Sequence, residues 1–169
     1  MENKKEITTK ENLFTVLDLM ESLEIRYWLD GGWGVDALVG YQTRNHRDID
    51  INFDAKDTAK LLEMLVNFGY QIDTDWRPVR IELHHSKLGY LDIHPFIIEK
   101  DGSCKQADLE GGFYDIPAIY FGMTTFDGRD IPCINLEGQK VFHTGYELRD
   151  VDRHDIEHLN QLCKELTIK

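Results

Sequence analysis

Two short stretches decide the fold that this sequence predicts: Trp28–Asp36 (WLDGGWGVD) and His46–Phe53 (HRDIDINF). In the second stretch, polar and apolar residues alternate strictly from residue 48 onward, as in a strand that buries one face. Asp48 and Asp50 are two residues apart, so both side chains project from the same face of that strand. The first stretch carries Gly31-Gly32, at a predicted turn from a strand into a short helix.

A third carboxylate, Asp92, is predicted to join this pair. The alternating runs Arg80–His84 and Tyr90–Ile97 suit an antiparallel hairpin, and Asp92 lies in the second run. If that strand lies beside residues 48–53, three carboxylates meet, and each resists ionisation. Magnesium prefers carboxylate oxygens, completed by water and phosphates. Two such ions can hold the attacking and leaving oxygens of an in-line displacement. Asp48, Asp50 and Asp92 are therefore predicted to be the metal ligands of a two-ion magnesium site.

The glycine pair Gly31-Gly32 predicts a phosphate cradle. Glycine lets the backbone approach a phosphate closely, and the N-terminus of the following helix supplies free N–H groups. A phosphate cradle shortly before a metal-binding strand is typical of phosphoryl or nucleotidyl transfer. Taken singly, each feature has a plainer interpretation, because glycine pairs are common in turns and aspartates are common on solvated faces. Aspartate is nevertheless depleted in strands, so three of them on strand faces favour a function.

This segment matches the beginning of two other motifs, but it lacks residues that each motif requires at later positions. A calcium-binding EF-hand loop starting at Asp48 needs glycine and glutamate where Phe53 and Ala59 stand. The run His46-Arg47-Asp48 is also the start of a protein-kinase catalytic loop, which needs asparagine at position 53. Both are rejected.

The remaining segments predict an α+β fold, with a mixed sheet flanked by helices. Thr8 and Glu11 suggest a capping box at the start of the first helix. Beyond residue 98, glycines and prolines punctuate loops and short strands, and two helices end the chain. We therefore expect a catalytic lobe over residues 1–98 and a smaller C-terminal lobe over residues 99–169, forming one compact unit. The further helices are expected over residues 33–39, 57–68, 136–143 and 150–166.

Composition limits the classes of function. The chain has 169 residues, a net charge of −12 and three widely spaced cysteines that match no zinc motif. This acidity argues against a nucleic-acid partner and is compatible with a cationic substrate. No apolar run is long enough to span a bilayer, and the segment Met1–Lys10 is polar and lysine-rich. We expect a cytoplasmic protein without a signal peptide or membrane association.

These motifs together resemble the nucleotidyltransferase superfamily, which has a Gly-Gly or Gly-Ser turn, an Asp-x-Asp strand and a later carboxylate. Here 15 residues, Trp33–Arg47, separate the glycine pair from Asp48. This spacing is similar to that of the small lincosamide enzymes and the aminoglycoside 2''-nucleotidyltransferases. The stretches Gly89–Pro95 (GYLDIHP) and Phe142–Tyr146 (FHTGY) resemble the small lincosamide nucleotidyltransferases in particular.

The resemblance implies a nucleotidyltransferase fold and an activity. ATP or another nucleoside triphosphate would bind at Gly31, Gly32 and the metals, and Asp92 would act as general base on the substrate hydroxyl. AMP would be transferred to a hydroxyl of a lincosamide such as lincomycin or clindamycin, with release of pyrophosphate, which confers resistance. The family also implies a homodimer. Two alternatives stay open: an aminoglycoside nucleotidyltransferase, and a non-catalytic minimal nucleotidyltransferase that acts through a protein partner.

Further residues are secondary candidates. Arg44 and Arg47 flank the metal strand and are predicted to hold the triphosphate, with surface ion pairs as the alternative. A second group is predicted to contact the substrate, each with a structural alternative such as core packing, a salt bridge or a plain turn. This group comprises Trp33, Trp76, Glu82, Tyr90, His94 and Glu110. His154 and His158 have the spacing of a metal pair but are better explained as a solvated helix face.

Overall fold

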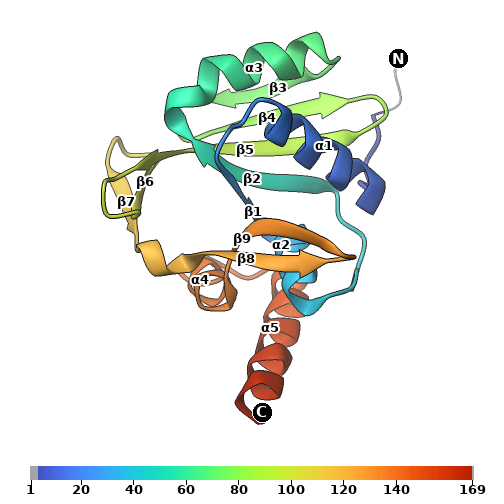
Figure 1. Cartoon of the computed structure of the whole chain (residues 1–169), viewed down its shortest axis with the longest axis vertical. Helices are drawn as coiled ribbons and strands as arrows, with labels where there is room; N and C mark the ends of the chain where they lie inside the picture. Colours follow the sequence, from blue (N-terminus) through green and yellow to red (C-terminus); the bar gives the residue numbers. More distant parts are fainter. Residues whose placement is uncertain (1–3, 169) are drawn as a thin grey trace.

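The computed structural model describes residues 4–168, so the first residues of the lysine-rich N-terminal segment lie outside it. A mixed sheet with strand order β3-β4-β5-β2-β1-β9-β8 forms the body, and helices flank it (Figure 1). The strands are β1 (Tyr27–Asp30), β2 (Asp48–Asp54), β3 (Gln71–Trp76), β4 (Arg80–His85), β5 (Gly89–Ile98), β6 (Cys104–Ala107), β7 (Phe113–Ile116), β8 (Phe121–Phe126) and β9 (Arg129–Ile134). The α-helices are α1 (Lys10–Ser22), α2 (Gly31–Val39), α3 (Thr58–Asn67), α4 (Leu136–Phe142) and α5 (Asp150–Ile168), and short 3-10 turns η1 (Ala55–Asp57) and η2 (Ala118–Tyr120) connect strands.

Strand β2 lies at the centre of the sheet. It pairs in parallel with β5 and antiparallel with β1, so that Ile51 faces Ile93 on one side and Leu29 on the other. All three side chains are fully buried. The alternation that predicted a strand with one buried face is confirmed, because the aspartates of β2 stay outside this core.

The chain beyond residue 98 continues the same sheet. β9 pairs in parallel with β1 at Leu29 and Cys133, and β8 pairs with β9. The β6–β7 hairpin continues from the end of β5 and stands at one side of the sheet (Figure 1). The division at residue 98 stays a prediction, but the segments on its two sides share one sheet.

The N-terminal cap of α1 differs from the expected one. Thr9 caps the helix and Asn12 bonds back, in place of Thr8 and Glu11. The hydroxyl of Thr8 is needed elsewhere, because it donates to the carbonyl of His46 and accepts from the indole N–H of Trp33. The cap therefore moves one residue along the chain.

Two other boundaries differ from the prediction. Helix α2 begins at Gly31, two residues earlier than expected, so the glycine pair forms its first turn. Its end at Gly40 is confirmed, with a φ of +103°. Strand β3 was not predicted from the sequence, and Trp76 is its last residue. Its side chains are mostly exposed, so it lacks the buried face that would have marked it in the sequence.

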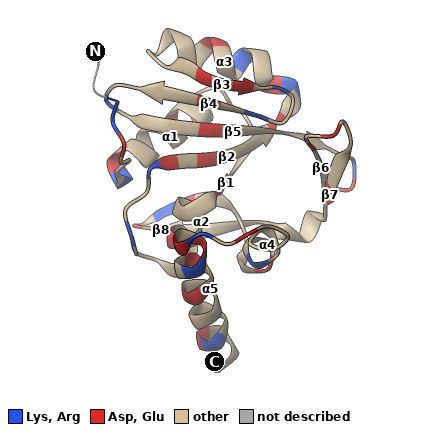
Figure 2. Ribbon diagram, turned by 180° about the vertical axis from the view of Figure 1, so that it is seen from behind, with Lys and Arg blue, Asp and Glu red and all other residues tan. Residues whose placement is uncertain are grey.

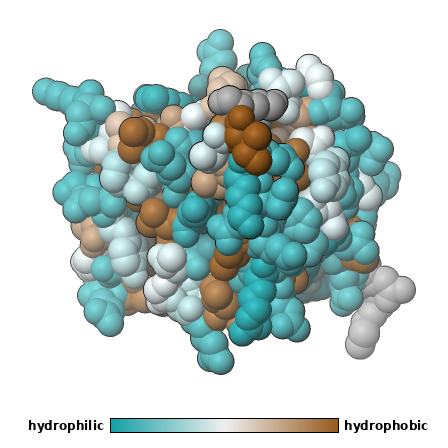
Figure 3. Space-filling model, turned by 90° about the horizontal axis from the view of Figure 1, so that it is seen from below, coloured by the Kyte–Doolittle hydropathy of each residue, from teal (hydrophilic) through white to brown (hydrophobic). Residues whose placement is uncertain are grey.

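Helix α5 extends away from the sheet at the C-terminus (Figure 1). Hydrophilic residues cover most of the surface at that end of the molecule (Figure 3). Across residues 4–168, no helix combines the length and apolar character needed to cross a membrane.

The central position of β2 yields a stability prediction. Replacing Ile51 by alanine should lower the free energy of unfolding by about 3 kcal/mol, because a fully buried side chain leaves a cavity among its strand neighbours. Ile72→Ala is the control, since Ile72 is 43% exposed on β3. It should cost less than about 1 kcal/mol. Urea denaturation followed by circular dichroism measures both, and equal losses would contradict the assigned core.

Candidate active site

The carboxylates of β2 and β5 form a row on one face of the sheet. In the parallel pairing, Asp50 lies beside Asp92, and Asp48 stands two residues before Asp50 on the same face. Figure 2 shows acidic segments side by side on these two strands, next to the start of α2. The predicted meeting of three aspartates is therefore confirmed.

The row offers two sets of possible ligand atoms, and Asp92 belongs to both. One set contains Asp50, Asp92 and His94; the other contains Asp48, Glu82 and Asp92. Within each set, the ligand atoms all lie within 4.8 Å of one another. The donors are mainly carboxylate oxygens, which suits a hard divalent cation such as magnesium.

Burial and mutual repulsion disfavour the charged carboxylates. Burial, with the charge of Asp48 as the second cause, raises the pKa of Asp50 to about 7. Burial also raises the pKa of Asp92. Burial alone would lower the pKa of His94, but its contact with Asp50 and the charge of Asp92 raise it instead. The site therefore favours any ligand that brings positive charge to the row.

An arginine on the β4 side contacts this row. Arg80 Nε lies 3.2 Å from each carboxylate oxygen of Asp92, and its Nη2 lies 3.4 Å from Glu82. Its guanidinium carbon stands 4.8 Å from the ring centroid of Trp76, which is 52% exposed. Trp76 thus supports an arginine that holds Asp92.

A second arginine lies at the start of β2. Arg47 stacks on Tyr90, with its guanidinium carbon 3.8 Å from the ring centroid. It lies 3.3 Å from Glu82 and 3.5 Å from Asp48. The structure therefore brings Arg47, Glu82 and Tyr90 together beside the aspartates, and the ion-pair alternative for Glu82 is found.

The glycine pair is needed for close packing. A Cβ on Gly31 would stand 2.1 Å from Asp50 Oδ2, and a Cβ on Gly32 would stand 2.4 Å from Arg44 Nη2. Gly31 also has a φ of +62°, which side chains rarely allow. Its backbone N–H donates to the carboxylate of Asp30, 2.8 Å away, which caps α2. The turn thus brings the start of α2 against the carboxylate row.

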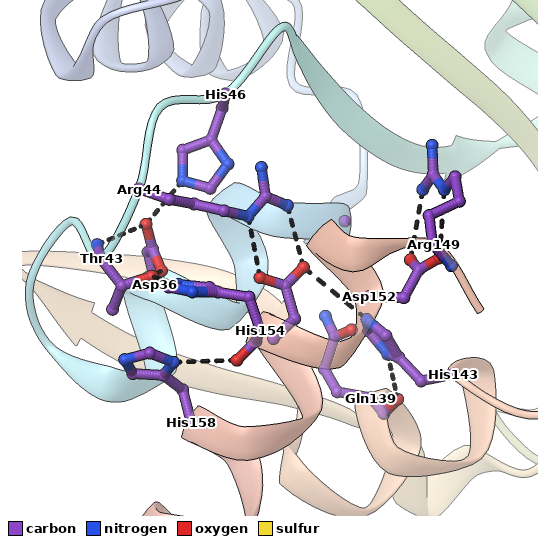
Figure 4. A network of polar contacts seen from close by, with 12 residues as sticks. Asp36, Thr43, Arg44, His46, Gln139, His143, Arg149, Asp152, His154 and His158 are labelled. Atoms are coloured by element: carbon purple, nitrogen blue, oxygen red, sulfur yellow. Dashed lines mark hydrogen bonds and ion pairs between the residues drawn. The ribbon is translucent and has the colours of Figure 1, made fainter.

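A buried polar network holds the segment between α2 and β2 (Figure 4). Arg44 donates through Nε and Nη2 to the two carboxylate oxygens of Asp155, at 3.0 and 2.9 Å. Asp155 is 3% exposed and also lies 3.8 Å from His143. His46 bonds to Asp36 at 2.5 Å. Arg44 therefore links this segment to α5 through an ion pair with a buried carboxylate, and this differs from the surface ion pair that the sequence suggested as an alternative.

Two cavities adjoin the carboxylate row: Asp48 and Asp50 line one, and Asn52 and His94 line the other. The glycine-turn cavity has a volume of about 480 Å³ and the hairpin cavity about 380 Å³. The glycine-turn cavity is lined mainly by Gly31, Gly32, Arg44, His46, Arg47, Asp48, Asp50, Arg149, Val151 and Asp155. The hairpin cavity is lined by Asp30, Asn52, His94, Gln106, Tyr114, Asp115, Ile116, Val141 and Phe142.

Several sequence candidates lie elsewhere. Trp33 is fully buried in the core and stacks on His46, so it lines neither cavity. Glu110 is exposed in the turn between β6 and β7. His154 bonds to Thr43 and His158 bonds to the His154 carbonyl, so these two residues support α5 rather than forming a metal pair.

Sequence reasoning missed most of the residues that line the two cavities. Asn52 could have been found, because it shares strand parity with Asp48 and Asp50. Most of the others come from β6, β7, α4 and the first residues of the α5 region, where no local pattern marks them. They include Gln106, Tyr114, Asp115, Phe142 and Arg149.

The fold and the carboxylate row define a nucleotidyltransferase. A model of the aminoglycoside-2''-adenylyltransferase family matches residues 12–159, so the chain belongs to this family. It is 48% identical, over 94% of its length and 99% of the relative, to a lincosamide resistance protein from Staphylococcus haemolyticus. A 2''-aminoglycoside nucleotidyltransferase from Klebsiella pneumoniae is 32% identical over 34% of this chain and 32% of its own.

Solved structures show the same architecture. The lincomycin-bound crystal structure of the lincosamide antibiotic adenylyltransferase LnuA superposes with a TM-score of 0.87 at 49% identity, over 92% of this chain and 99% of that one. The structure of ANT(2'')-Ia in complex with adenylyl-2''-tobramycin gives a TM-score of 0.61 at 20% identity, covering 94% and 90% of the two chains. This second likeness shows the fold alone.

The contact between Gly31 and Asp50 yields a second prediction. Gly31→Ala should lower the free energy of unfolding by about 2 kcal/mol more than Gly40→Ala does. Both glycines have positive φ, but a Cβ at Gly40 meets nothing within 4 Å, whereas one at Gly31 meets Asp50. Gly40→Ala therefore controls for backbone strain. If urea denaturation shows the same loss of unfolding free energy for both variants, the Asp50 side chain can move away from a Cβ at residue 31 at no energetic cost, and the prediction is wrong.

Proposed function

We propose that this protein transfers AMP from ATP to a hydroxyl of a lincosamide such as lincomycin or clindamycin, releasing pyrophosphate and conferring resistance. One observation carries the proposal: the row of carboxylates borders an arginine-lined cavity at Asp48 and Asp50, and His94, which lies beside the row, lines a second cavity that has apolar walls. The near full-length similarity to a lincosamide resistance protein and to LnuA supports the substrate class.

Asp48, Asp50 and Asp92 are proposed to hold magnesium. The two sets of ligand atoms that share Asp92 are compatible with two ions. Magnesium bound there would neutralise charge on the triphosphate and polarise the reacting phosphorus. The raised pKa of Asp50 supports this assignment, because a cation would favour its ionised form.

The glycine-turn cavity is proposed to take the triphosphate. The N–H groups at the start of α2 and the guanidinium groups of Arg44 and Arg47 supply donors for phosphate oxygens. Asp48 and Asp50 are part of its lining, and the α-phosphate would lie beside them. In an in-line displacement, pyrophosphate leaves on the side opposite to the attacking hydroxyl. The acceptor would therefore enter from beyond the carboxylate row.

The hairpin cavity suits this acceptor. His94 belongs to its lining and stands 3.7 Å from both Asp50 and Asp92, so the cavity reaches the reacting groups. Phe142 supplies an apolar wall, and Asp115 supplies negative charge. Lincosamides carry an amine as well as apolar groups, and both features find a counterpart here.

Asp92 is proposed to be the general base. It would accept the proton of the attacking hydroxyl while the new bond to the α-phosphorus forms and the bond to pyrophosphate breaks. Arg80 and His94 oppose the effect of burial on the pKa of Asp92, which favours the ionised form that a base needs. Tyr90, Glu82 and Trp76 surround this edge of the row and remain proposed substrate contacts.

An aminoglycoside acceptor is the second candidate, because the matching family model describes aminoglycoside adenylyltransferases. The apolar wall formed by Ile116, Val141 and Phe142 fits a polycationic sugar less well than a lincosamide. A homodimer and a cytoplasmic location are also proposed. The three free cysteines support a reducing compartment.

The test is mass spectrometry of products after incubation with ATP and magnesium. Wild-type protein should add an adenylyl group to lincomycin and clindamycin but not to aminoglycosides. Replacing both Asp48 and Asp50 by asparagine should reduce turnover about a hundredfold or more while the protein stays folded, because the ligand charge is lost.

Asp54→Asn is the matched control for this experiment. Asp54 ends the same strand and caps the η1 turn through its side chain, which asparagine can also do. It should retain full turnover. Adducts on aminoglycosides alone would replace the substrate class, and unchanged turnover of the double variant would refute the metal assignment.

A further inference from the structure

The arginines of the glycine-turn cavity differ in how much hydrogen-bonding capacity they have left. Arg44 uses Nε and Nη2 on Asp155 and Nη1 on the carbonyl of Asn45, so each of its nitrogens already has a protein acceptor. Arg47 lies against Tyr90 and is paired with Glu82, which draws it toward the β4 side of the site. Each of these two arginines therefore has only part of its five N–H donors left for phosphate oxygens.

Arg149, the residue before α5, also lines this cavity. Its backbone N–H and its Nε both donate to Asp152 Oδ2, at 2.9 and 3.0 Å, and Nη2 donates to Oδ1 at 3.2 Å. Figure 4 shows the guanidinium standing above Asp152, on the far side of the network from His46. The carboxylate of Asp152 thus fixes one edge of the guanidinium.

The other edge of this guanidinium remains open. The side chain of Asp152 is 5% exposed, whereas that of Arg149 is 75% exposed. Across residues 4–168, Nη1 of Arg149 has no hydrogen-bond acceptor. A guanidinium that is held on one edge and open on the other loses little conformational freedom when it binds a phosphate, and its planar fork matches two phosphate oxygens.

Arg153 shows what an ordinary surface pair on this helix looks like. It makes a single contact with Asp150, at 3.1 Å, and that aspartate is fully exposed. Arg153 does not line the glycine-turn cavity. Arg149 differs in both respects, because its partner is buried and its side chain lies with Gly31, Gly32 and Asp48 around one cavity.

We propose that Arg149 binds the triphosphate of the nucleotide, and that Asp152 is the positioning residue that holds it in place. This proposal rests on the proposed function. Helix α5 thereby contributes directly to the nucleotide site, opposite the glycine turn, and the phosphate chain lies between the starts of α2 and α5. The C-terminal segment is then part of the catalytic machinery.

Calorimetric titration of the full chain tests this, with magnesium and α,β-methylene-ATP as one ligand and inorganic tripolyphosphate as the other. Arg149→Gln should weaken binding of both about tenfold or more, because a charge-assisted hydrogen bond is lost. Arg149→Lys should recover part of the affinity, since lysine keeps the charge but not the fork. Arg153→Gln is the matched control and should bind as wild type does.

Steady-state kinetics provide a second readout that a purely structural role would not change. Arg149→Gln should raise KM for ATP while leaving KM for the lincosamide unchanged. Asp152→Asn should shift KM for ATP in the same direction. If it unfolds, the Arg149 variants alone decide the matter.

The outcomes separate this inference from the proposed function. Active wild-type protein together with an Arg149→Gln variant of unchanged nucleotide and tripolyphosphate affinity would overturn the inference alone. Wild-type protein that neither binds the nucleotide analogue nor modifies any acceptor would overturn both.

Discussion

The repulsion between carboxylates on one face of the sheet is the constraint on which the rest of the structure depends. Parallel pairing of β2 with β5 brings Asp50 beside Asp92, and the strand period adds Asp48. The buried residues of the opposite face fix this register, because a slip by one residue would turn Ile51 outward and the aspartates into the core. The hydrophobic core therefore stabilises the fold and, at the same time, enforces an unfavourable cluster of charge.

The surrounding residues contact this cluster of negative charge from three sides. Arg80 and Arg47 pair with the cluster from the β4 side, and aromatic rings support both guanidinium groups. His94 lies between Asp50 and Asp92 from the hairpin side. The start of α2 approaches from the third side, which only glycine permits at that distance from Asp50. Each of these neighbours neutralises only part of the negative charge, so the carboxylates can still bind cations. A phosphate-transfer site requires this ability.

The sequence was most informative where the two-residue alternation of a strand sets both which side chains are buried and which face carries the functional side chains. The strands of Asp48 and Asp92, the glycine turn and the hairpin could be predicted because alternation and turn residues lie within a few positions of each other. Strand β3 could not, since its side chains are mostly exposed. The pairing of Arg44 with Asp155 joins residues 111 positions apart, and no local pattern encodes such a contact. The same holds for the lining of the hairpin cavity, which is assembled from β5, β6, β7 and α4.

The C-terminal segment shows how residues far apart in the sequence meet at the site. It was expected to form a smaller lobe within one compact unit, and its strand β9 pairs with β1 at Leu29, two residues before the glycine turn. Asp155 of α5 then holds Arg44, and Gln139 of α4 donates to Asp30, the residue that caps α2. Helices α4 and α5 thus reach the same turn from two sides through buried polar contacts. Because such contacts are costly to leave unsatisfied, both helices help to hold the glycine turn and the Arg44 segment in place beside the carboxylate row.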